Sequence, residues 1–477
     1  MLGRVLSSKE LKALDINANY YGISLTNLML NAGKNVYEEL IRRVNVKNKK
    51  IFVLCGSGYN GGDGLAFCKF CNEANITVFI KKEKLRSSCL ELLKEIESKD
   101  NVKVEDLEKA LNANFDNSIV IDALLGIGIK GMPKEPYKSI IAKLNASKCY
   151  KVSIDIPSGM EPDIGEGFYV NADLVICLHA AKQGVVKRGL NYVVKNIGLE
   201  KVEHLAGPGD VFLALPKKFK EAHKGYFGKV AVVAGSKDYV GAGILASLAA
   251  SKIVDLVYLI GCREVKLASL NYPEIICKEA DIKDVESYED ILRNVDCILV
   301  GPGLGMDGGI VNDLLTRFKD KKFVIDADAI KFLELKKVNK NCILTPHSGE
   351  MEILYEKPPS DIKEKIDFLK KFSTNNSNVT VLLKGSEDII VCGEKYKINK
   401  TGNVGMTKGG TGDVLAGLTA AFFAKTNSFY AACAAAFING FTGDLVKSDF
   451  SYYFTARDLV NYIPKALKNI EKYFKSV

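Results

Sequence analysis

Short apolar runs, each ending in glycine or polar residues and followed by a helical pattern, recur along the whole chain. A run that is apolar throughout is typical of a strand buried on both faces, and alternation with helices is typical of a parallel sheet. The pattern therefore predicts an α/β protein whose parallel sheets are covered by helices on both faces, which gives three layers. The runs lie at residues 50–55, 76–80, 118–122, 150–155, 172–178, 229–234, 256–260, 297–300, 322–325, 342–344, 379–384 and 389–392.

The length of the chain predicts two domains. It has 477 residues, and a single hydrophobic core stops growing at about 250–300 residues. The alternation of strands and helices breaks at residues 207–210, which read GPGD and precede a basic segment. Because a break rich in glycine and proline is typical of a domain boundary, we expect domains at residues 1–212 and 213–477.

Composition and charge favour a soluble protein that binds small anions. The chain is 47% apolar and 26% charged, and its 66 basic and 57 acidic residues give a formal charge of +9 without an arginine-rich block. We therefore expect no nucleic-acid partner. No apolar run approaches the length of a bilayer span, and the chain starts with a helix-capping pair, Ser7 and Glu10. We expect a cytoplasmic protein without a membrane partner.

The cysteines argue against a metal or disulfide framework. Twelve cysteines are scattered along the chain, and only Cys68 and Cys71 form a CxxC pair. One such pair, without a second and with four histidines in the whole chain, is a poor zinc or redox signal. We expect reduced thiols in the core.

The stretch from Asn403 to Gly417, NVGMTKGGTGDVLAG, predicts a phosphate site. Its glycines let the backbone turn tightly, and a helical pattern begins at Asp413. The unpaired N–H groups and the positive dipole end of a helix attract phosphate. Asp413 then places a carboxylate beside the phosphate, where it can take a proton from an attacking hydroxyl. The alternative is a glycine-rich loop with an ordinary aspartate cap.

Polar side chains follow several strands of the first half. Asp122 ends one predicted strand, Asp155 and Ser158 follow another, and Asn60 and Asp63 lie in the glycine-rich loop after the first. Such groups converge on one edge of a parallel sheet. A single aspartate at a strand end is usually a cap, but two of them beside a glycine-rich loop favour a site for an ion or a ribose.

Three motifs of the first half, GSGYNGGDG, DALLGIGIKG and SIDIPSG, resemble in order and spacing the epimerase domain of bifunctional NAD(P)H-hydrate repair enzymes. The resemblance covers residues 1–212 and implies a Rossmann-like domain. It assigns potassium to Asn60, Asp122 and Ser158, and contact with the nicotinamide end to Asp155. Epimerisation at C6 needs an acid and a base near the C6 hydroxyl, and we expect Asp155 in this role, with Lys182 either a weaker second choice or a solvated side chain. Tyr59 departs from the family, which usually has a second asparagine there. The implied substrate contacts are Tyr59, Asn60, Gly61, Gly62, Asp63, Gly126, Ile127, Gly128, Ile129, Lys130, Gly131, Met132 and Asp155.

The second half resembles the ribokinase-like fold through GPGLG, DADA, TPHSGE, KG and GGTGD, and within it the ADP-dependent NAD(P)H-hydrate dehydratases, which share HKGxxG at residues 223–228. The resemblance covers residues 213–477. It implies ADP with Mg²⁺, and a hydrate site at Ala242, Gly303, His347 and Asp413. Asp388 departs from the family's threonine, and residues 252–257 replace a Gly-Ala-Gly turn. The implied nucleotide contacts are Lys384, Gly385, Ser386, Glu387, Asp388, Asn403, Val404, Gly405, Met406, Thr407, Lys408, Gly409, Gly410, Thr411 and Gly412.

Together the two resemblances imply a repair enzyme for hydrated NADH and NADPH. The first domain would interconvert the R and S hydrates, and the second would use ADP to dehydrate the S hydrate, releasing AMP and phosphate. Asp413 would deprotonate the C6 hydroxyl as it attacks the β-phosphoryl group. We expect a homo-oligomer whose partners are these small molecules.

Two other functions remain open on the sequence. A ribokinase-like kinase that phosphorylates a sugar or vitamin with ATP would need the same GGTGD turn. The first domain would then be a non-catalytic module that binds nucleotide or RNA. The candidate residues of the first domain are all present, which argues against a site that has lost its activity. They are Asn60, Asp122, Asp155 and Ser158.

Overall fold

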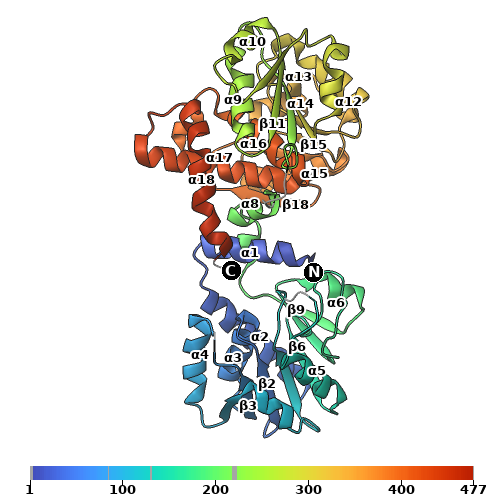
Figure 1. The fold of residues 1–477 in the computed structure, drawn as a ribbon, viewed down its shortest axis with the longest axis vertical. Coiled ribbons are helices and arrows are strands. Elements are labelled where there is room, and N and C mark those ends of the chain that lie inside the picture. The colour runs from blue at the N-terminus through green and yellow to red at the C-terminus, as the bar shows by residue number, and fades with distance from the viewer. Residues whose placement is uncertain (1–3, 84, 129–130, 217–222, 476–477) are drawn as a thin grey trace. The chain divides into compact units, whose positions relative to one another are not determined.

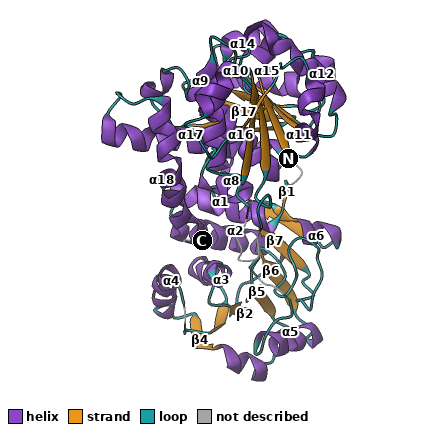
Figure 2. Ribbon diagram, turned by 45° about the horizontal axis from the view of Figure 1, so that its top comes forward, coloured by secondary structure: helices purple, strands orange, loops and turns teal. Residues whose placement is uncertain are grey.

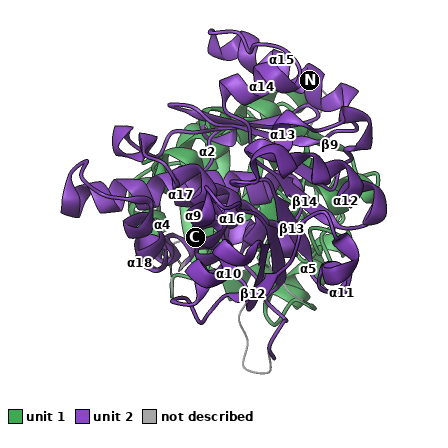
Figure 3. Cartoon of the chain, turned by 90° about the horizontal axis from the view of Figure 1, so that it is seen from above, with its two compact units in different colours: residues 1–201 green, residues 202–477 purple. Residues whose placement is uncertain are grey.

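The chain divides into two compact units, residues 1–201 (unit 1) and 202–477 (unit 2), coloured green and purple in Figure 3. The computed structural model describes residues 4–83, 85–128, 131–216 and 223–475. The boundary predicted at 212–213 falls inside a helix of unit 2, α8 (Pro208–Ala214), which packs against α17 (Ser428–Phe450). Unit 2 therefore includes the segment before residue 213.

Unit 1 is built on a seven-stranded parallel sheet, as far as its described residues show. The strands run in the order β4-β3-β2-β5-β6-β7-β9. The chain first winds from β2 outward to β4 and then returns to β5, so β2 and β5 are neighbours at the point where the winding direction reverses. The strands are β2 (Lys50–Cys55), β3 (Asn75–Ile80), β4 (Val102–Asp106), β5 (Ile119–Ala123), β6 (Tyr150–Ile154), β7 (Leu174–Leu178) and β9 (Tyr192–Lys195).

Helices lie on both faces of this sheet, as Figures 1 and 2 show. A short separate pair, β1 (Val5–Leu6) with β8 (Ala181–Lys182), joins the N-terminal segment to the end of the sheet. The helices of unit 1 are α1 (Ser8–Tyr20), α2 (Leu25–Arg43), α3 (Tyr59–Phe70), α4 (Ser87–Glu97), η1 (Leu107–Asn112), α5 (Tyr137–Ala146) and α6 (Gln183–Lys187). The short helix α7 (Glu200–Glu203) spans the boundary at residues 201 and 202.

Unit 2 is built on a second sheet, with nine strands in its described part and the order β12-β11-β10-β13-β14-β15-β16-β17-β18. The strands from β12 to β16 are parallel, and β16, β17 and β18 pair antiparallel. The winding direction reverses at β10. The strands are β10 (Lys229–Val233), β11 (Leu256–Gly261), β12 (Ile276–Glu279), β13 (Cys297–Val300), β14 (Lys322–Ile325), β15 (Cys342–Leu344), β16 (Thr380–Leu383), β17 (Asp388–Cys392) and β18 (Lys395–Asn399).

Layers of helices cover both faces of this sheet too, which confirms two three-layer α/β/α arrangements (Figure 2). Besides α8 and α17, the helices are α9 (Val240–Ser251), α10 (Arg263–Ser269), η2 (Val285–Tyr288), α11 (Glu289–Arg293), η3 (Gly305–Ile310), α12 (Val311–Arg317), α13 (Asp328–Lys331), η4 (Leu335–Lys337), α14 (Ser348–Leu354), α15 (Ile362–Asn375), η5 (Val404–Thr407), α16 (Thr411–Lys425) and α18 (Ala456–Lys475).

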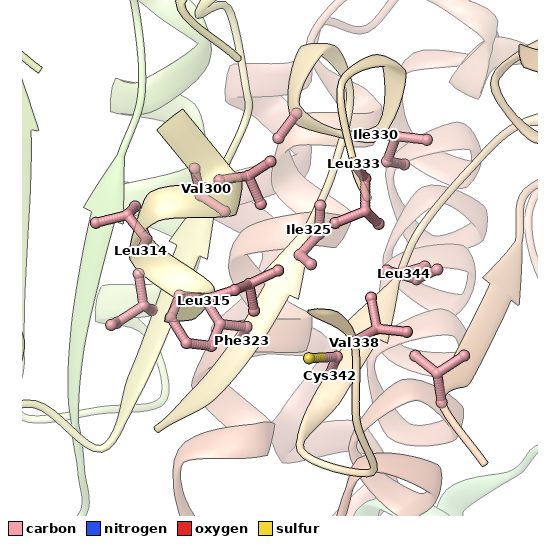
Figure 4. Packing of buried hydrophobic residues seen from close by; sticks show 14 of the residues in the cluster. Val300, Leu314, Leu315, Phe323, Ile325, Ile330, Leu333, Val338, Cys342 and Leu344 are labelled. Carbon is pink, nitrogen blue, oxygen red and sulfur yellow. The ribbon is translucent and has the colours of Figure 1, made fainter. Parts of the chain in front are cut away.

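The core on one face of the second sheet fixes the ends of its central strands. Val300, Ile325 and Leu344 lie in register on β13, β14 and β15 and are fully buried. Leu314 and Leu315 of α12 belong to the same cluster, shown in Figure 4. Each such side chain stabilises the fold by about 1.5–3 kcal/mol. The loops that follow these strands therefore start from rigid positions.

Helix α17 is long and apolar enough to cross a membrane by length and composition, the only described helix that passes this test. However, 78% of its most apolar window is buried inside the structure, where it packs on α16 and α18. Burial against other helices is what a core helix of a globular domain requires.

The segment before α8 pairs with the outer edge of the second sheet. Leu205 forms a parallel bridge with Ile398 of β18, and Ala206 N–H donates to Ile398 O at 2.9 Å. Beneath this bridge Lys397 Nζ donates to both carboxylate oxygens of Asp210, at 2.7 and 2.9 Å. Asp210 and Lys397 are both buried, so the two charged groups of this ion pair are shielded from solvent.

This buried pair gives a stability prediction. Lys397→Met leaves the Asp210 carboxylate buried without its cation, which costs about 3 kcal/mol or more, whereas replacing both partners by neutral groups costs much less. Urea unfolding of the full chain, followed by circular dichroism, should show the loss in Lys397→Met and its partial recovery in Asp210→Asn/Lys397→Met. The control is Lys400→Met, whose exposed pair with Glu387 at 3.5 Å contributes less than about 1 kcal/mol. Equal urea midpoints of unfolding for Lys397→Met and Lys400→Met would contradict the prediction.

Candidate active sites

The first site lies where the loops after β2 and β5 meet, at the reversal point of the unit 1 sheet. Ligands bind at such points in open α/β sheets. The two loops approach so closely that a Cβ atom on Gly56 would lie 1.9 Å from Leu124 O. Similarly, a Cβ atom on Gly61 would lie 2.0 Å from Gly56 O. Only glycine permits this approach, which explains the glycine-rich sequence after β2.

Oxygen atoms from three segments converge behind these loops. Asp122 is fully buried and accepts hydrogen bonds from Ser153 Oγ at 2.7 Å and from the Ser158 N–H at 2.9 Å. Ser158 Oγ accepts from the Leu125 N–H at 2.8 Å. Asn60 Nδ2 donates to Leu125 O at 3.2 Å. The structure thus brings together Asn60, Asp122 and Ser158, the three residues predicted to hold an ion.

This cluster suits a hard cation. Burial raises the pKa of Asp122, although hydrogen bonds from Ser158 and Ser153 oppose the shift. No described group donates a hydrogen bond to the buried Oδ1 atom of Asn60. A buried acceptor without a donor is costly, and a bound cation would satisfy it. Among the described residues there is no group of three His, Cys, Asp or Glu that could hold a metal. The donors that converge here are oxygen atoms, which suit a hard cation rather than zinc.

Asp155 lies directly after β6 in a left-handed backbone conformation, with φ of 69°. Its own N–H donates to Ile176 O at 2.8 Å, and its Oδ1 accepts the Leu178 N–H at 3.0 Å. The fully buried Lys182 ammonium contacts the same carboxylate and also donates to Leu178 O at 3.1 Å. Strained backbone held by several partners is typical of functional positions. The two residues predicted for catalysis in unit 1 therefore form one pair.

The other predicted contacts of unit 1 lie around the same loops. Tyr59 begins α3 and its hydroxyl accepts from Arg86 Nη1 at 2.6 Å, while the guanidinium also lies 4.1 Å from the ring centroid. Arg86 was not predicted, because no motif marks it.

Burial, then the charges of Asp155 and Asp15, raise the pKa of Asp63, another predicted contact. Met132 is exposed, whereas Ile129 and Lys130 lie outside the described residues.

The second site lies at the N-terminus of α16, close to the ends of the unit 2 strands. Gly410 precedes α16 with φ of 94°, and a Cβ atom there would lie 2.6 Å from a Leu245 methyl group. Thr411 Oγ1 bonds to Met406 O at 2.6 Å and to Lys408 O at 2.9 Å. The loop before α16 is therefore held tightly, with the first turn of the helix partly exposed for an anion.

A lysine directly after β16 lies between this turn and two carboxylates, one directly after β14 and one in α14. Lys384 Nζ donates to Asp326 Oδ1 at 2.9 Å and lies 3.5 Å from Glu350 Oε2. A Cβ atom on Gly412 would lie 3.9 Å from the same ammonium. Burial alone would lower the pKa of Lys384, but Asp326 and Glu350 raise it. The ammonium therefore stays charged beside the predicted phosphate position.

Asp413, in the first turn of α16, has an altered proton affinity. Burial, the largest cause, and the charges of Asp326, Asp328 and Glu350 raise its pKa to about 7, while Lys384 opposes the shift. A carboxylate with this pKa is matched to general-base catalysis near neutral pH. The sequence predicts Asp413 as a site residue. It marks Asp326 and Asp328 only as part of the DADA motif and predicts no role for them.

His347 caps α14. Its Nδ1 accepts the N–H groups of Gly349 at 3.0 Å and Glu350 at 3.2 Å, so the hydrogen-bond network places its proton on Nε2. The Glu350 side chain returns to the His347 N–H at 2.9 Å. The ring is 59% exposed, which leaves its outer edge open to a ligand. His347 also forms a β-bridge with Lys384, so a predicted hydrate contact lies beside a predicted nucleotide contact.

Ala242 and Gly303, the other two predicted hydrate contacts, are neighbours. A Cβ atom on Gly303 would lie 3.1 Å from Ala242 Cβ and 2.9 Å from Tyr239 O. Gly303 also has φ of 65°, which glycine adopts without strain. The Tyr239 side chain beside them is 62% exposed, and the sequence did not mark it. Small residues here leave room at the ends of β10 and β13.

Several predicted nucleotide contacts have side chains already bound within unit 2. Asn403 Oδ1 accepts the Gly405 N–H and its Nδ2 donates to Asp444, both at 3.0 Å. Lys408 Nζ donates to Tyr452 O at 2.8 Å and to Phe454 O at 2.7 Å. These two side chains are therefore already engaged, and any contact of theirs with a nucleotide would come from backbone groups. Their role as contacts stays a prediction.

Both departures from the family pattern in the second half have structural consequences. Asp388 accepts the Gly385 N–H at 3.2 Å and Asn399 Nδ2 at 3.0 Å, so its carboxylate ties the KGSED loop to β18. Within residues 252–257, Asp255 accepts the N–H groups of Gly225 at 2.8 Å and Phe227 at 3.0 Å. Asp255 thus orders the HKGYFG loop in place of a glycine turn.

Comparison with known proteins agrees with the two-domain division of the motifs. The family model described as YjeF-related protein N-terminus matches residues 25–184, and the model described as NAD(P)H-hydrate dehydratase matches residues 230–465. The bifunctional NAD(P)H-hydrate repair enzyme of Archaeoglobus fulgidus is 38% identical over 97% of this chain and 98% of its own length. The corresponding enzyme of Methanocaldococcus jannaschii is 36% identical over 97% of this chain and 94% of its own.

A solved structure is also similar to part of the chain. The ADP/ATP-dependent NAD(P)H-hydrate dehydratase from Bacillus subtilis, co-crystallised with ATP and Mg²⁺, is 24% identical, covering 55% of this chain and 97% of that one with a TM-score of 0.47. Because this TM-score is below 0.5, the assignment rests on the sequence matches. These confirm the resemblance seen in the motifs, and the chain belongs to the family of bifunctional NAD(P)H-hydrate repair enzymes.

Proposed function

We propose that this chain repairs hydrated NADH and NADPH in two steps. Unit 1 interconverts the R and S hydrates, and unit 2 uses ADP to dehydrate the S hydrate, with release of AMP and phosphate. The observation that carries the second step is the position of Asp413, in the first turn of α16 directly after the glycine-rich turn, where burial raises its pKa to about 7. Family membership supports both steps.

The proposed dehydration converts a poor leaving group into a good one. Asp413 takes the proton of the C6 hydroxyl as that oxygen attacks the β-phosphoryl group of ADP, and AMP departs. The N–H groups at the start of α16 and the Lys384 ammonium stabilise the charge on the transferring group. The lone pair of the ring nitrogen then expels phosphate from C6, and loss of a C5 proton restores the dihydropyridine.

Magnesium would accompany ADP in this site. The chain offers carboxylates at the right edge of the sheet, since Asp326 and Glu350 both lie beside Lys384. Mg²⁺ is usually held by one or two carboxylates together with phosphate oxygens. When bound, it would supply positive charge to the diphosphate, which adds to that of Lys384.

The proposed epimerisation breaks and re-forms one bond at C6, and the protein assists it by proton transfer. Water leaves C6 and returns on the other face, or the ring opens and closes, and either route needs an acid and a base at the C6 hydroxyl. Asp155 suits this role, because Lys182 and the Leu178 N–H hold its carboxylate at the end of β6, next to β5. Asn60, Asp122 and Ser158 would hold K⁺ nearby, where its charge would balance the buried Asp122.

The pKa of Asp413 gives a pH prediction for unit 2. Only the ionised carboxylate accepts the hydroxyl proton, so activity is lost as pH falls through about 7. The second-order rate constant for the S hydrate at low ADP, which reports the free enzyme, should be about tenfold lower at pH 6 than on its plateau above pH 8. Initial rates of dihydropyridine formation measure it. A rate constant that stays level from pH 8 to pH 6 is incompatible with Asp413 as the base.

The whole proposal is tested by incubating the protein with mixed R and S NADH hydrates and either ADP or ATP. Recovery of the full dihydropyridine absorbance with ADP is the expected result. Recovery of the S fraction alone would remove epimerisation from unit 1. No recovery with either nucleotide would overturn the repair function and favour a small-molecule kinase.

A further inference from the structure

The loop that leads to α16, residues 401–410, packs directly on helix α17. A Cβ atom on Gly440 of α17 would lie 2.3 Å from Thr401 Oγ1 and 2.5 Å from Thr401 O. A Cβ atom on Gly443, also on α17, would lie 2.3 Å from Met406 Sδ. Since the neighbour of Gly440 includes backbone, only glycine permits this approach. Helix α17 therefore forms the support on which the predicted nucleotide loop rests.

Asp444, one turn of α17 beyond Gly440, ties the start of this loop to the helix. Its Oδ2 accepts the Gly402 N–H and its Oδ1 accepts Asn403 Nδ2, both at 3.0 Å. Asn403 Oδ1 in turn accepts the Gly405 N–H at 3.0 Å, which caps η5. Because the Gly405 N–H needs an acceptor, the Asn403 amide can present only its NH₂ group to the carboxylate. Three hydrogen bonds thus connect α17 to the backbone at the start of the loop.

The end of the loop is held by other contacts. Thr411 Oγ1 bonds to Met406 O and to Lys408 O. Lys408 Nζ donates to two carbonyl groups of the segment that precedes α18. The turn directly before Asp413 is therefore fixed without Asp444. A change at Asp444 should disturb the start of the loop and leave the proposed base in place.

We propose that Asp444 is a positioning residue of the nucleotide site, which holds residues 402–405 in the conformation that receives ADP. This rests on the proposed use of ADP by unit 2. The Asn403 side chain is engaged within the protein, so contacts from this part of the loop come from backbone groups, whose directions depend on the bonds that hold them. A loop that is ordered before binding spares ADP the entropy cost of ordering it.

The test is the dissociation constant for ADP in Asp444→Asn, measured by calorimetry on the full chain. The new amide offers one acceptor to the two donors of Gly402 and Asn403, so one donor always faces another donor. If the ordered loop is then populated to about one tenth, the apparent dissociation constant rises about tenfold. The KM for ADP should rise with it, whereas kcat at saturating ADP should stay within about twofold, because bound ADP selects the ordered loop.

Two further variants control for charge and for loss of stability. Asp449→Asn makes the same replacement on α17, at an exposed carboxylate that accepts Lys465 Nζ at 2.8 Å, and should leave ADP binding unchanged. In Asn403→Asp/Asp444→Asn the carboxylate and the amide exchange places. The carboxylate can then accept the Gly405 N–H, while the amide donates to the carboxylate and accepts the Gly402 N–H. This exchange should return the dissociation constant to within about threefold of wild type.

The outcomes separate positioning from a purely structural role. An unchanged dissociation constant in a folded Asp444→Asn protein would overturn the proposal. So would a loss that the exchanged pair does not recover, or a fall in kcat and in the urea midpoint of unfolding without a rise in the KM for ADP.

A second variant covers the case in which Asp444→Asn fails to fold. Asn403→Ser keeps a hydroxyl that can cap Gly405 but is too short to reach Asp444, so the dissociation constant for ADP should rise in the same way. An unchanged constant in this variant would overturn the proposal. A wild-type protein that binds ADP but does not dehydrate the S hydrate would instead overturn the proposed function of unit 2 and leave the role of Asp444 in binding to stand.

Discussion

We expect the replacement of Asp413 by asparagine to abolish ADP-dependent dehydration. The variant keeps the shape of the side chain and the N–H groups at the start of α16, but it removes the only group proposed to take the C6 hydroxyl proton. General bases contribute about 10²–10⁴-fold to rate, and here the phosphoryl transfer also depends on the alkoxide, so kcat should fall by at least about 10³-fold. Dihydropyridine absorbance, starting from pure S hydrate and ADP, measures it.

Binding and folding controls separate this role from a structural one. ADP affinity measured by calorimetry should change less than about threefold, because the anion site is built from backbone groups and Lys384. Asp313→Asn removes a half-exposed carboxylate of unit 2 that pairs with Arg317 at 3.0 Å, and should dehydrate at the normal rate. A variant at position 413 that dehydrates near the wild-type rate would exclude Asp413 from the mechanism.

The second large effect is expected for Asp155→Asn, which should stop R and S interconversion. Asparagine tolerates the φ of 69° found at this position, so the backbone is preserved while the acid and base are lost. The interconversion rate should fall by about 10²–10⁴-fold. With ADP and a mixture of hydrates, the variant should recover only the S fraction.

The two variants are also each other's controls. Asp155→Asn should dehydrate the S hydrate normally, and Asp413→Asn should interconvert the hydrates normally, because the groups lie in separate compact units. An equimolar mixture of the two single variants should therefore recover the full absorbance, whereas the double variant should recover none. Failure of the mixture, with both single activities intact, would mean that the hydrate must pass between the two sites of one molecule.

The inner strands of both sheets could be predicted from the sequence, and the outermost strands could not. In the described part of the chain, β4, β9, β12 and β18 are the end strands of the two sheets, and the apolar runs predicted none of them. An inner parallel strand is buried on both faces and is apolar throughout, as in β2 and β13. An end strand is partly exposed, as KYKIN of β18 and ICKE of β12 show, so its sequence resembles that of a loop.

A similar limit applies to the sites. Residues that follow a strand or open a helix, such as Asp155 and Asp413, are visible because their position along the chain determines their place on the sheet edge. Partners that meet only through tertiary structure are not visible. Lys384 and Asp326 are 58 residues apart in sequence.

The bridge between Leu205 and Ile398 bears on where this chain can be divided. A shortened protein that starts at residue 213 would lack the segment that pairs with β18, and it would also lack Asp210, the partner of Lys397. The exposed strand edge would then be open to pairing with other copies, which is a common origin of aggregation. A shortened protein that starts at residue 202 retains both partners, so the second unit is expected to be soluble alone only when it begins before His204.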